Sequence, residues 1–216
     1  MLDNPPHSLL NLNNKNLPKF NIIKPQYDRS KLSPGIVHIG VGNFHRAHLS
    51  WYLHRLMQKN KNLDWGIIGS GVLNYDREMQ QKLKKQDFLT TLIELDPQGN
   101  KNCEIIGPMI DYASVESNNL SLINAMSDSR IRIVSLTVTE GGYFLDGENG
   151  DLDFTNPDIV NDINNPNSPK TVFGAIVYAL NIRRNNGHGP ITCLSCDNLI
   201  KNGDKLKQAV IGIAKN

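Results

Sequence analysis

The chain has 216 residues, of which 39% are hydrophobic, and this proportion predicts a globular protein of one large domain rather than a disordered chain. The formal net charge of +2 gives no electrostatic reason to expect a nucleic acid or an acidic membrane surface as a partner. No apolar run approaches the roughly 20 residues of a membrane helix, and residues 1–20 lack the apolar core of a signal peptide, so we expect a cytoplasmic protein.

The chain begins with an irregular stretch and continues into regular secondary structure. Residues 1–33 are expected to form an N-terminal arm, with an extended segment near 20–23, and residues 34–216 a dinucleotide-binding domain. The apolar run at 36–39 predicts the first strand. Apolar residues at helical spacing then predict a helix over about 45–59.

Strands and helices alternate through the rest of the chain. We expect strand 63–71, helix 76–85, a hairpin of strands 88–95 and 102–106, helix 117–126, strand 131–138, a loop-like region over 146–167, helix 172–183, strand 190–195 and helix 203–215. This order predicts an α/β fold, namely a Rossmann-like, doubly wound and mostly parallel sheet with a hairpin insertion.

The turn after the first strand is the most informative feature of the sequence. A first glycine permits the tight turn, a second allows backbone to approach a pyrophosphate, and the next helix offers its N–H groups and dipole to the anion. His45 stands where the common fingerprint has a third glycine, so a plain strand-to-helix turn remains the alternative. We predict a cofactor site formed by Ile39, Gly40, Val41, Gly42, Asn43, Phe44, His45 and Arg46, without assigning His45 a role in proton transfer.

Asp76 is the candidate for binding the ribose hydroxyls. A carboxylate there would accept two hydrogen bonds and repel a 2′-phosphate, which favours NAD over NADP. The spacing is unusual, because Asp76 follows Gly40 by 36 positions against about 20 in the common fingerprint. Asp76 could equally cap the following helix, and the adjacent Arg77 could accept a phosphate, so NADP stays open.

The chain has three cysteines, too few for a disulfide framework. Cys193 and Cys196 have the spacing of a zinc or redox pair, but no second Cys or His pair occurs at finger-like spacing. We interpret them as small core residues where a strand ends, and we expect no metal site.

Several segments together resemble one family, the long-chain polyol dehydrogenases of the mannitol 2-dehydrogenase type. They read Tyr27-Asp-Arg29, Gly35-Ile-Val-His-Ile-Gly-Val-Gly-Asn-Phe-His-Arg-Ala-His48, Trp65-Gly-Ile-Ile-Gly69, Gln86-Asp87, Thr137-Val-Thr-Glu-Gly-Gly-Tyr143, Ser195-Cys-Asp-Asn198 and Asn202-Gly203. The resemblance covers most of residues 27–203 and only the cofactor domain of the family. It implies an NAD- or NADP-dependent interconversion of a sugar alcohol and a ketose, or of a related sugar acid, without a metal.

The resemblance also implies two catalytic residues. Asn198 matches an asparagine that stabilises the developing alkoxide, although it could simply hold a turn. Glu140 matches a glutamate that assists proton movement, although it could instead accept amides of the glycines that follow it. The family's catalytic lysine lies in a helical substrate domain, in a Lys-x-x-x-x-Asn-x-x-His pattern. Here Leu180 takes the lysine's place before Asn185 and His188, which we interpret as coincidence.

Two functions therefore stay open. The first is the cofactor domain of an NAD-dependent polyol or sugar-acid oxidoreductase, which would need a lysine from a separate substrate domain. The second is a truncated, catalytically silent dinucleotide-binding or interaction module.

Overall fold

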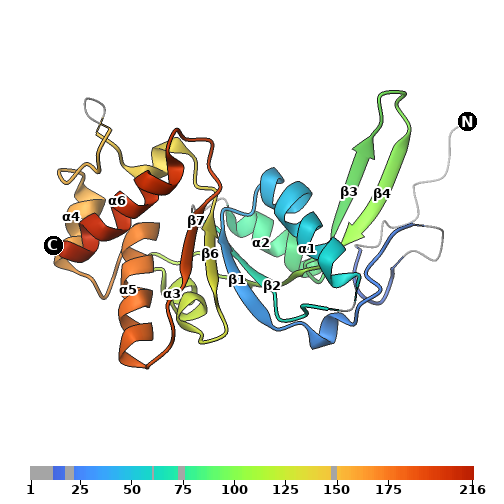
Figure 1. The fold of residues 1–216 in the computed structure, drawn as a ribbon, viewed down its shortest axis with the longest axis horizontal. Helices are drawn as coiled ribbons and strands as arrows, with labels where there is room; N and C mark the ends of the chain where they lie inside the picture. The colour runs from blue at the N-terminus through green and yellow to red at the C-terminus, as the bar shows by residue number, and fades with distance from the viewer. Residues whose placement is uncertain (1–11, 18–21, 60, 73–75, 147–149) are drawn as a thin grey trace, which may run out of the picture.

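The computed structural model describes residues 12–17, 22–59, 61–72, 76–146 and 150–216. Strand β1 (Pro34–Ile39) lies at the centre of a parallel sheet with the strand order β5-β2-β1-β6-β7 (Figure 1). The other strands are β2 (Gly66–Ser70), β5 (Met109–Ala113), β6 (Ile133–Leu136) and β7 (Thr192–Ser195), and all neighbours in the sheet run parallel. In chain order this is 3-2-1-4-5, the arrangement of a doubly wound dinucleotide-binding sheet.

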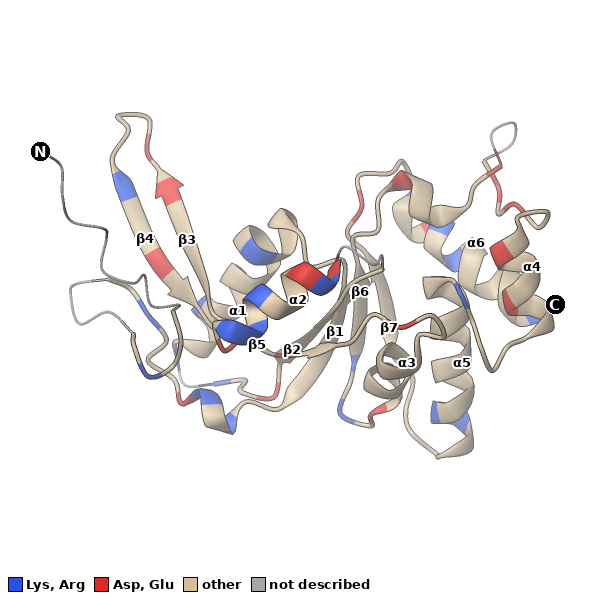
Figure 2. Ribbon diagram, turned by 180° about the vertical axis from the view of Figure 1, so that it is seen from behind, with Lys and Arg blue, Asp and Glu red and all other residues tan. Residues whose placement is uncertain are grey.

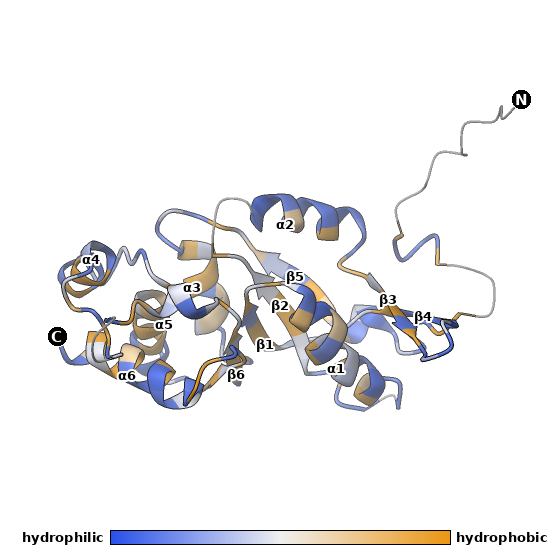
Figure 3. Cartoon of the chain, turned by 90° about the horizontal axis from the view of Figure 1, so that it is seen from above, coloured by the Kyte–Doolittle hydropathy of each residue, from blue (hydrophilic) through white to orange (hydrophobic). Residues whose placement is uncertain are grey.

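The β1 sequence suits a central strand because its side chains alternate between two buried faces. Ile36 packs with Leu83 of α2 (Asp76–Lys85) and with Leu53 of α1 (Ser50–Met57). Val37 and Ile39 belong to the larger core beneath α3 (Leu120–Ser127), α5 (Val172–Asn185) and α6 (Asn202–Lys215). Figure 3 shows the two helix groups on the two halves of the sheet. Within the described ranges, none of the helices combines the length and apolar character that a bilayer crossing requires.

The predicted hairpin insertion is confirmed. Strands β3 (Thr90–Leu95) and β4 (Lys101–Ile106) pair antiparallel between α2 and β5, and they project away from the main sheet (Figure 2). Their turn closes because the Asp96 carboxylate accepts the amides of Gln98 (2.9 Å) and Asn100 (2.8 Å), while Gly99 adopts a φ of +84°. Figure 2 also shows acidic and basic residues on most elements.

The structure differs from the expected elements in two places. The region 146–167, expected as loop, contains helix α4 (Pro157–Asn164), which starts because the Asn156 side chain accepts the amide of Asp158 (3.0 Å) and Pro157 takes the first helical position. Strand β5 is not among the expected elements. The other elements occur where predicted: β2, β3, β6 and β7 are shorter than expected, and β1 and β4 are slightly longer. Residues 20 and 21 of the expected extended segment lie outside the described residues.

The described part of the arm packs against the domain. The Arg29 guanidinium donates to the carbonyls of Gly107 (2.9 Å), Asp87 (2.7 Å) and Met109 (2.8 Å), and it thereby joins the arm to the ends of α2 and β4 and the start of β5. Tyr27, 3% exposed, places its hydroxyl 2.9 Å from Nδ1 of His54 on α1. These contacts give the Tyr-Asp-Arg motif a structural role. The division into an arm and a domain at residue 33 stays a prediction.

Candidate functional site

The turn after β1 uses its two glycines in different ways. Gly40 has a φ of +93°, and a Cβ at this position would collide with the carbonyl oxygen of Thr137 on the neighbouring β6 segment. Gly42 has ordinary backbone angles, and a Cβ added there would meet no atom closer than the Gly40 oxygen, at 4.0 Å. Its amide donates to that same oxygen (2.7 Å), which closes the turn on itself. Gly40 is therefore required for the conformation, whereas Gly42 keeps the cleft side open.

A cleft of about 770 Å³ lies at this turn. Its walls come from residues 40–44 after β1, from Val72, Asp76 and Met79 after β2, and from residues 137–139 with Gly141 and Gly142 after β6. The cleft thus sits at the carboxyl ends of β1, β2 and β6. Between β1 and β6 the strand order reverses, and this is the position where doubly wound sheets bind their ligands.

His45 shows what replaces the third glycine of the fingerprint. Its imidazole is fully buried and stacks on His38 of β1, with ring centroids 4.3 Å apart and planes 23° apart. The helix accommodates this side chain by opening with a π-helical turn, η2 (His45–Leu49), before α1. Burial lowers the pKa of His45 well below its usual value, and it lowers the pKa of His38 to about 4. Both rings are therefore neutral near pH 7, and His45 is buried away from the cleft.

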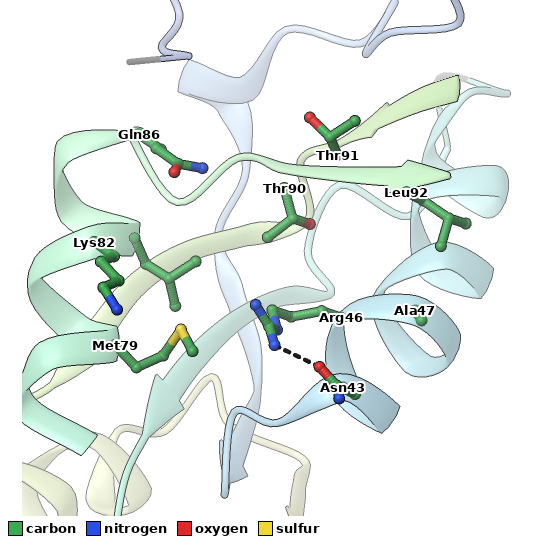
Figure 4. A pocket seen from close by; sticks show the side chains of 10 residues that line it. Asn43, Arg46, Ala47, Met79, Lys82, Gln86, Thr90, Thr91 and Leu92 are labelled. Atoms are coloured by element: carbon green, nitrogen blue, oxygen red, sulfur yellow. Dashed lines mark hydrogen bonds between the residues drawn. The ribbon is translucent and has the colours of Figure 1, made fainter. Parts of the chain in front are cut away.

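The predicted cofactor residues do not all face the cleft. Residues 40–44 and Asp76 line it, whereas the side chains of Ile39 and His45 are buried behind the turn. Arg46 lines a neighbouring cavity of about 470 Å³ between the turn, α2 and β3, where its Nη2 donates to Oδ1 of Asn43 (2.7 Å, Figure 4). Lys82 borders both cavities.

The structure separates the acidic and the basic candidate after β2. Asp76 is the first residue of α2, and its Oδ2 accepts the amide of Val72 (2.8 Å), which joins the segment after β2 to the start of α2. Arg77 instead donates to the carbonyl of Val115, with Nη2 at 3.1 Å, so its guanidinium is directed to the end of β5. Of the two, only Asp76 lines the cleft.

Glu140 and Asn198 lie on two loops that one carboxylate joins. Asp197 accepts the amides of Val138 (3.1 Å) and Thr139 (2.9 Å) and the hydroxyl of Tyr143 (2.9 Å). Glu140 is exposed and begins the short helix η3 (Glu140–Tyr143) beside the cleft, and Asn198 directly follows Asp197. Asp197 is not among the candidates drawn from the sequence, and the structure shows that it connects the β7 loop to the β6 loop.

Asn185 and His188, which mimic the family's lysine pattern, lie elsewhere. His188 Nδ1 is 2.9 Å from the carbonyl of Ser127, which ends α3 just before β6 begins. These residues are therefore at the amino-terminal edge of the sheet, opposite the cleft, as expected for a coincidental match. The three cysteines are free thiols, each half-buried.

The strand order, the glycine turn and the cleft at the switch point define a Rossmann-type α/β domain. The family described as the mannitol dehydrogenase Rossmann domain matches residues 34–216. The chain belongs to this family, which confirms the resemblance drawn from the sequence.

Named relatives agree with this assignment. The chain is 52% identical over 194 residues to mannitol 2-dehydrogenase of Cereibacter sphaeroides, and 39% identical over 203 residues to polyol:NADP oxidoreductase of Gluconobacter oxydans. These alignments cover 90% and 93% of the chain but only 40% and 41% of the relatives. The structure matches Pseudomonas fluorescens mannitol 2-dehydrogenase, solved as a ternary complex with NAD and D-mannitol, with a TM-score of 0.88, 41% identity, and coverage of 95% of this chain and 42% of that one. The chain thus spans about two fifths of its curated relatives' length.

Proposed function

We propose that the chain binds NAD in the cleft at the Gly40–Gly42 turn and forms the cofactor-binding part of an oxidoreductase that interconverts a sugar alcohol and a ketose, or a related sugar acid. The observation that carries the proposal is the cleft itself, which combines an open glycine, a helix start and a carboxylate at the switch point of the sheet. The named NAD complex of the Pseudomonas enzyme supports it.

The residues present fit a dinucleotide. The first turn of a helix leaves N–H groups without intrahelical partners, and here that turn follows Gly42 and faces the cleft through Asn43 and Phe44. We assign the diphosphate to these amides and the ribose hydroxyls to Asp76. The negative charge of Asp76 favours NAD, although the NADP-named Gluconobacter relative keeps the phosphorylated coenzyme as the alternative.

A bound nicotinamide would supply hydride transfer to or from the substrate carbon. We propose that the Asn198 amide holds the substrate oxygen and that Glu140 moves a proton between the site and water. A lysine from a separate substrate domain would complete the site, because Leu180 stands in the only matching pattern of this sequence. The cytoplasmic location stays a prediction from the sequence.

The test is a titration with NADH, followed by protein fluorescence or calorimetry. A methyl group at Gly42 finds room in the free protein but would stand where a bound diphosphate approaches the turn. Gly42→Ala should therefore melt like the wild type and bind NADH at least about tenfold more weakly, a difference of ~1.4 kcal/mol. Gly203→Ala is the matched control, since this position is also open but lies at the start of α6.

The wild-type titration decides the proposal. If the wild-type chain gives no signal at millimolar NADH, or if Gly42→Ala binds like Gly203→Ala, the assignment is wrong. The silent binding module is the second candidate, favoured by the absence of the patterned lysine from these residues. We expect no turnover of mannitol with NAD by the 216-residue chain alone. Clear turnover would show that no further domain is needed.

A further inference from the structure

The carbonyl oxygen of Gly40 is the meeting point of three hydrogen-bond donors. The Gly42 amide approaches it at 2.7 Å, the Thr137 hydroxyl at 2.7 Å and Nε2 of His38 at 3.1 Å. A carbonyl oxygen only accepts, so this contact requires the His38 tautomer with its proton on Nε2, a nitrogen that also lies 3.3 Å from the Thr137 hydroxyl. Two of these donors come from side chains outside the turn, and they lie on the two strand segments that flank the switch point.

His38 is itself held from two sides. Because Nε2 carries the proton, Nδ1 is the acceptor, and the Ser135 hydroxyl on β6 donates to it (2.8 Å). The opposite constraint is the stacked ring of His45, whose Nε2 lies 3.0 Å from the Ser50 hydroxyl at the start of α1. The two imidazoles therefore tie β1, β6 and the first helix together directly behind the turn. We call His38, His45, Ser135 and Thr137 the polar spine.

The polar spine fixes a peptide plane. In a planar trans peptide the carbonyl and the following N–H point in opposite directions, so fixing the Gly40 oxygen also fixes the direction of the Val41 amide. Gly40 has a φ of +93° and could otherwise adopt many conformations, since glycine has the widest choice of any residue. An external constraint on its carbonyl is therefore the most direct way to hold the turn in one geometry.

We propose that His38 and Thr137 are positioning residues for the dinucleotide turn, which hold the Gly40–Val41 peptide in the orientation that accepts the coenzyme diphosphate. The inference rests on the proposed function for its ligand, but not for the geometry of the turn. His38 does not need to touch the coenzyme with its side chain, because it is fully buried and acts through the backbone of the turn. Thr137 also lines the cleft, so His38 is the cleaner test of the inference.

The experiment compares His38→Met, which keeps much of the volume without a donor, with His38→Gln, whose amide can still reach the Gly40 oxygen. His54→Met is the matched control, because His54 is equally buried but is bonded to Tyr27, away from the cleft. Each variant is measured for melting temperature, for NADH dissociation constant, and for amide hydrogen exchange at Val41 and Gly42. Thr137→Val, an isosteric change, tests the second donor if His38→Met does not fold.

We expect His38→Met and Thr137→Val each to weaken NADH binding about tenfold, as for one lost buried hydrogen bond, and to speed exchange of the turn amides. His38→Gln should recover most of both losses, and His54→Met should melt lower while binding NADH within about twofold of wild type. Unchanged NADH affinity in His38→Met, or in Thr137→Val if His38→Met does not fold, would overturn the inference. If the wild type itself does not bind NADH, the proposed function fails, and hydrogen exchange alone decides: faster turn exchange than in His54→Met supports the polar spine, and equal exchange refutes it.

Discussion

Asp197→Asn is the substitution that most directly tests how the loops that carry Glu140 and Asn198 are held together. The Asp197 carboxylate accepts two backbone amides from Val138 and Thr139 and the Tyr143 hydroxyl, at 2.9 to 3.1 Å. Thr139 needs such support, since its φ of +66° with ψ of +168° belongs to a region that glycine almost alone occupies. The strained residue immediately precedes Glu140, so loosening it would also displace the candidate proton-transfer group.

The magnitude follows from the acceptors lost. Hydrogen bonds to a charged group contribute about 1.5–3 kcal/mol each. An asparagine at this position keeps one oxygen that can accept a hydrogen bond, whereas its NH₂ group is a donor and cannot accept the second backbone amide. Because Asp197 is half-buried and Thr139 would relax its strain of about 1–3 kcal/mol, we expect a net loss near ~3 kcal/mol. For a chain of this size that corresponds to a melting temperature lower by roughly 6–12 °C.

Thermal and urea unfolding of the variant measure this loss. Tyr143→Phe removes the phenolic hydroxyl, which also meets the Ser195 hydroxyl (2.6 Å), so its loss sets an upper limit on the share of the Tyr143–Asp197 bond. Asp153→Asn serves as the control, because Asp153 also accepts a backbone amide and a hydroxyl, both from Thr155, but on an exposed turn remote from the β6 loop. If Asp197→Asn melts within about 1 °C of the wild type, where roughly 6 °C or more is expected, the carboxylate does not hold these loops together.

Two further predictions concern acid stability and coenzyme choice. Burial lowers the pKa of His38 and His54 to about 4 and that of His45 well below its usual value, so the unfolded chain binds protons that the folded chain does not. The free energy of unfolding should therefore be highest above about pH 6.5 and fall towards pH 4, by up to ~1.4 kcal/mol per pH unit for each histidine. Urea titrations at about pH 7.5, 6 and 5 measure this fall, and a free energy of unfolding that does not change with pH would contradict it. Asp76→Ser should reduce the preference for NADH over NADPH by about tenfold or more, because it removes the charge that repels a 2′-phosphate. Parallel titrations with the two coenzymes measure this preference, and an unchanged ratio of dissociation constants would mean that another group discriminates at the ribose.

The sequence predicted those parts of the fold that have strong local signals. The first strand is a continuous apolar run, and the hairpin has Asp-Pro-Gln-Gly-Asn at its turn, so both could be located. Strand β5 could not, because it has only five residues and carries Asp111 at its centre. Helix α4 escaped prediction because its Asn-Pro-Asp start also occurs in loops, and only the buried contact of Ile159 shows that the segment packs as a helix.

For the site, the sequence pattern predicts the glycine turn but not the side-chain contacts that hold it in place. The glycine pattern and the strand before it are adjacent in the chain, so their chemistry can be read directly. The contacts behind and beside the turn join residues far apart: His38 and Ser135 are separated by 97 positions, and Thr139 and Asp197 by 58. Such pairs depend on which strands become neighbours, and no local pattern contains that information.

The missing third glycine reflects a different solution to the same packing problem. In the common fingerprint that glycine lets the helix approach the strand closely. Here a histidine takes the position, and the first turn of the helix widens to the π form around it. The imidazole fills the space by stacking on the ring two residues before Gly40, while the Ser135 and Ser50 hydroxyls each meet a nitrogen of one ring. In the pattern His-x-Gly-x-Gly-x-x-His, the two histidines therefore form one packing unit. Replacing one of them should destabilise the turn more than replacing both, and a single His45→Gly change should loosen the turn rather than restore the common fingerprint.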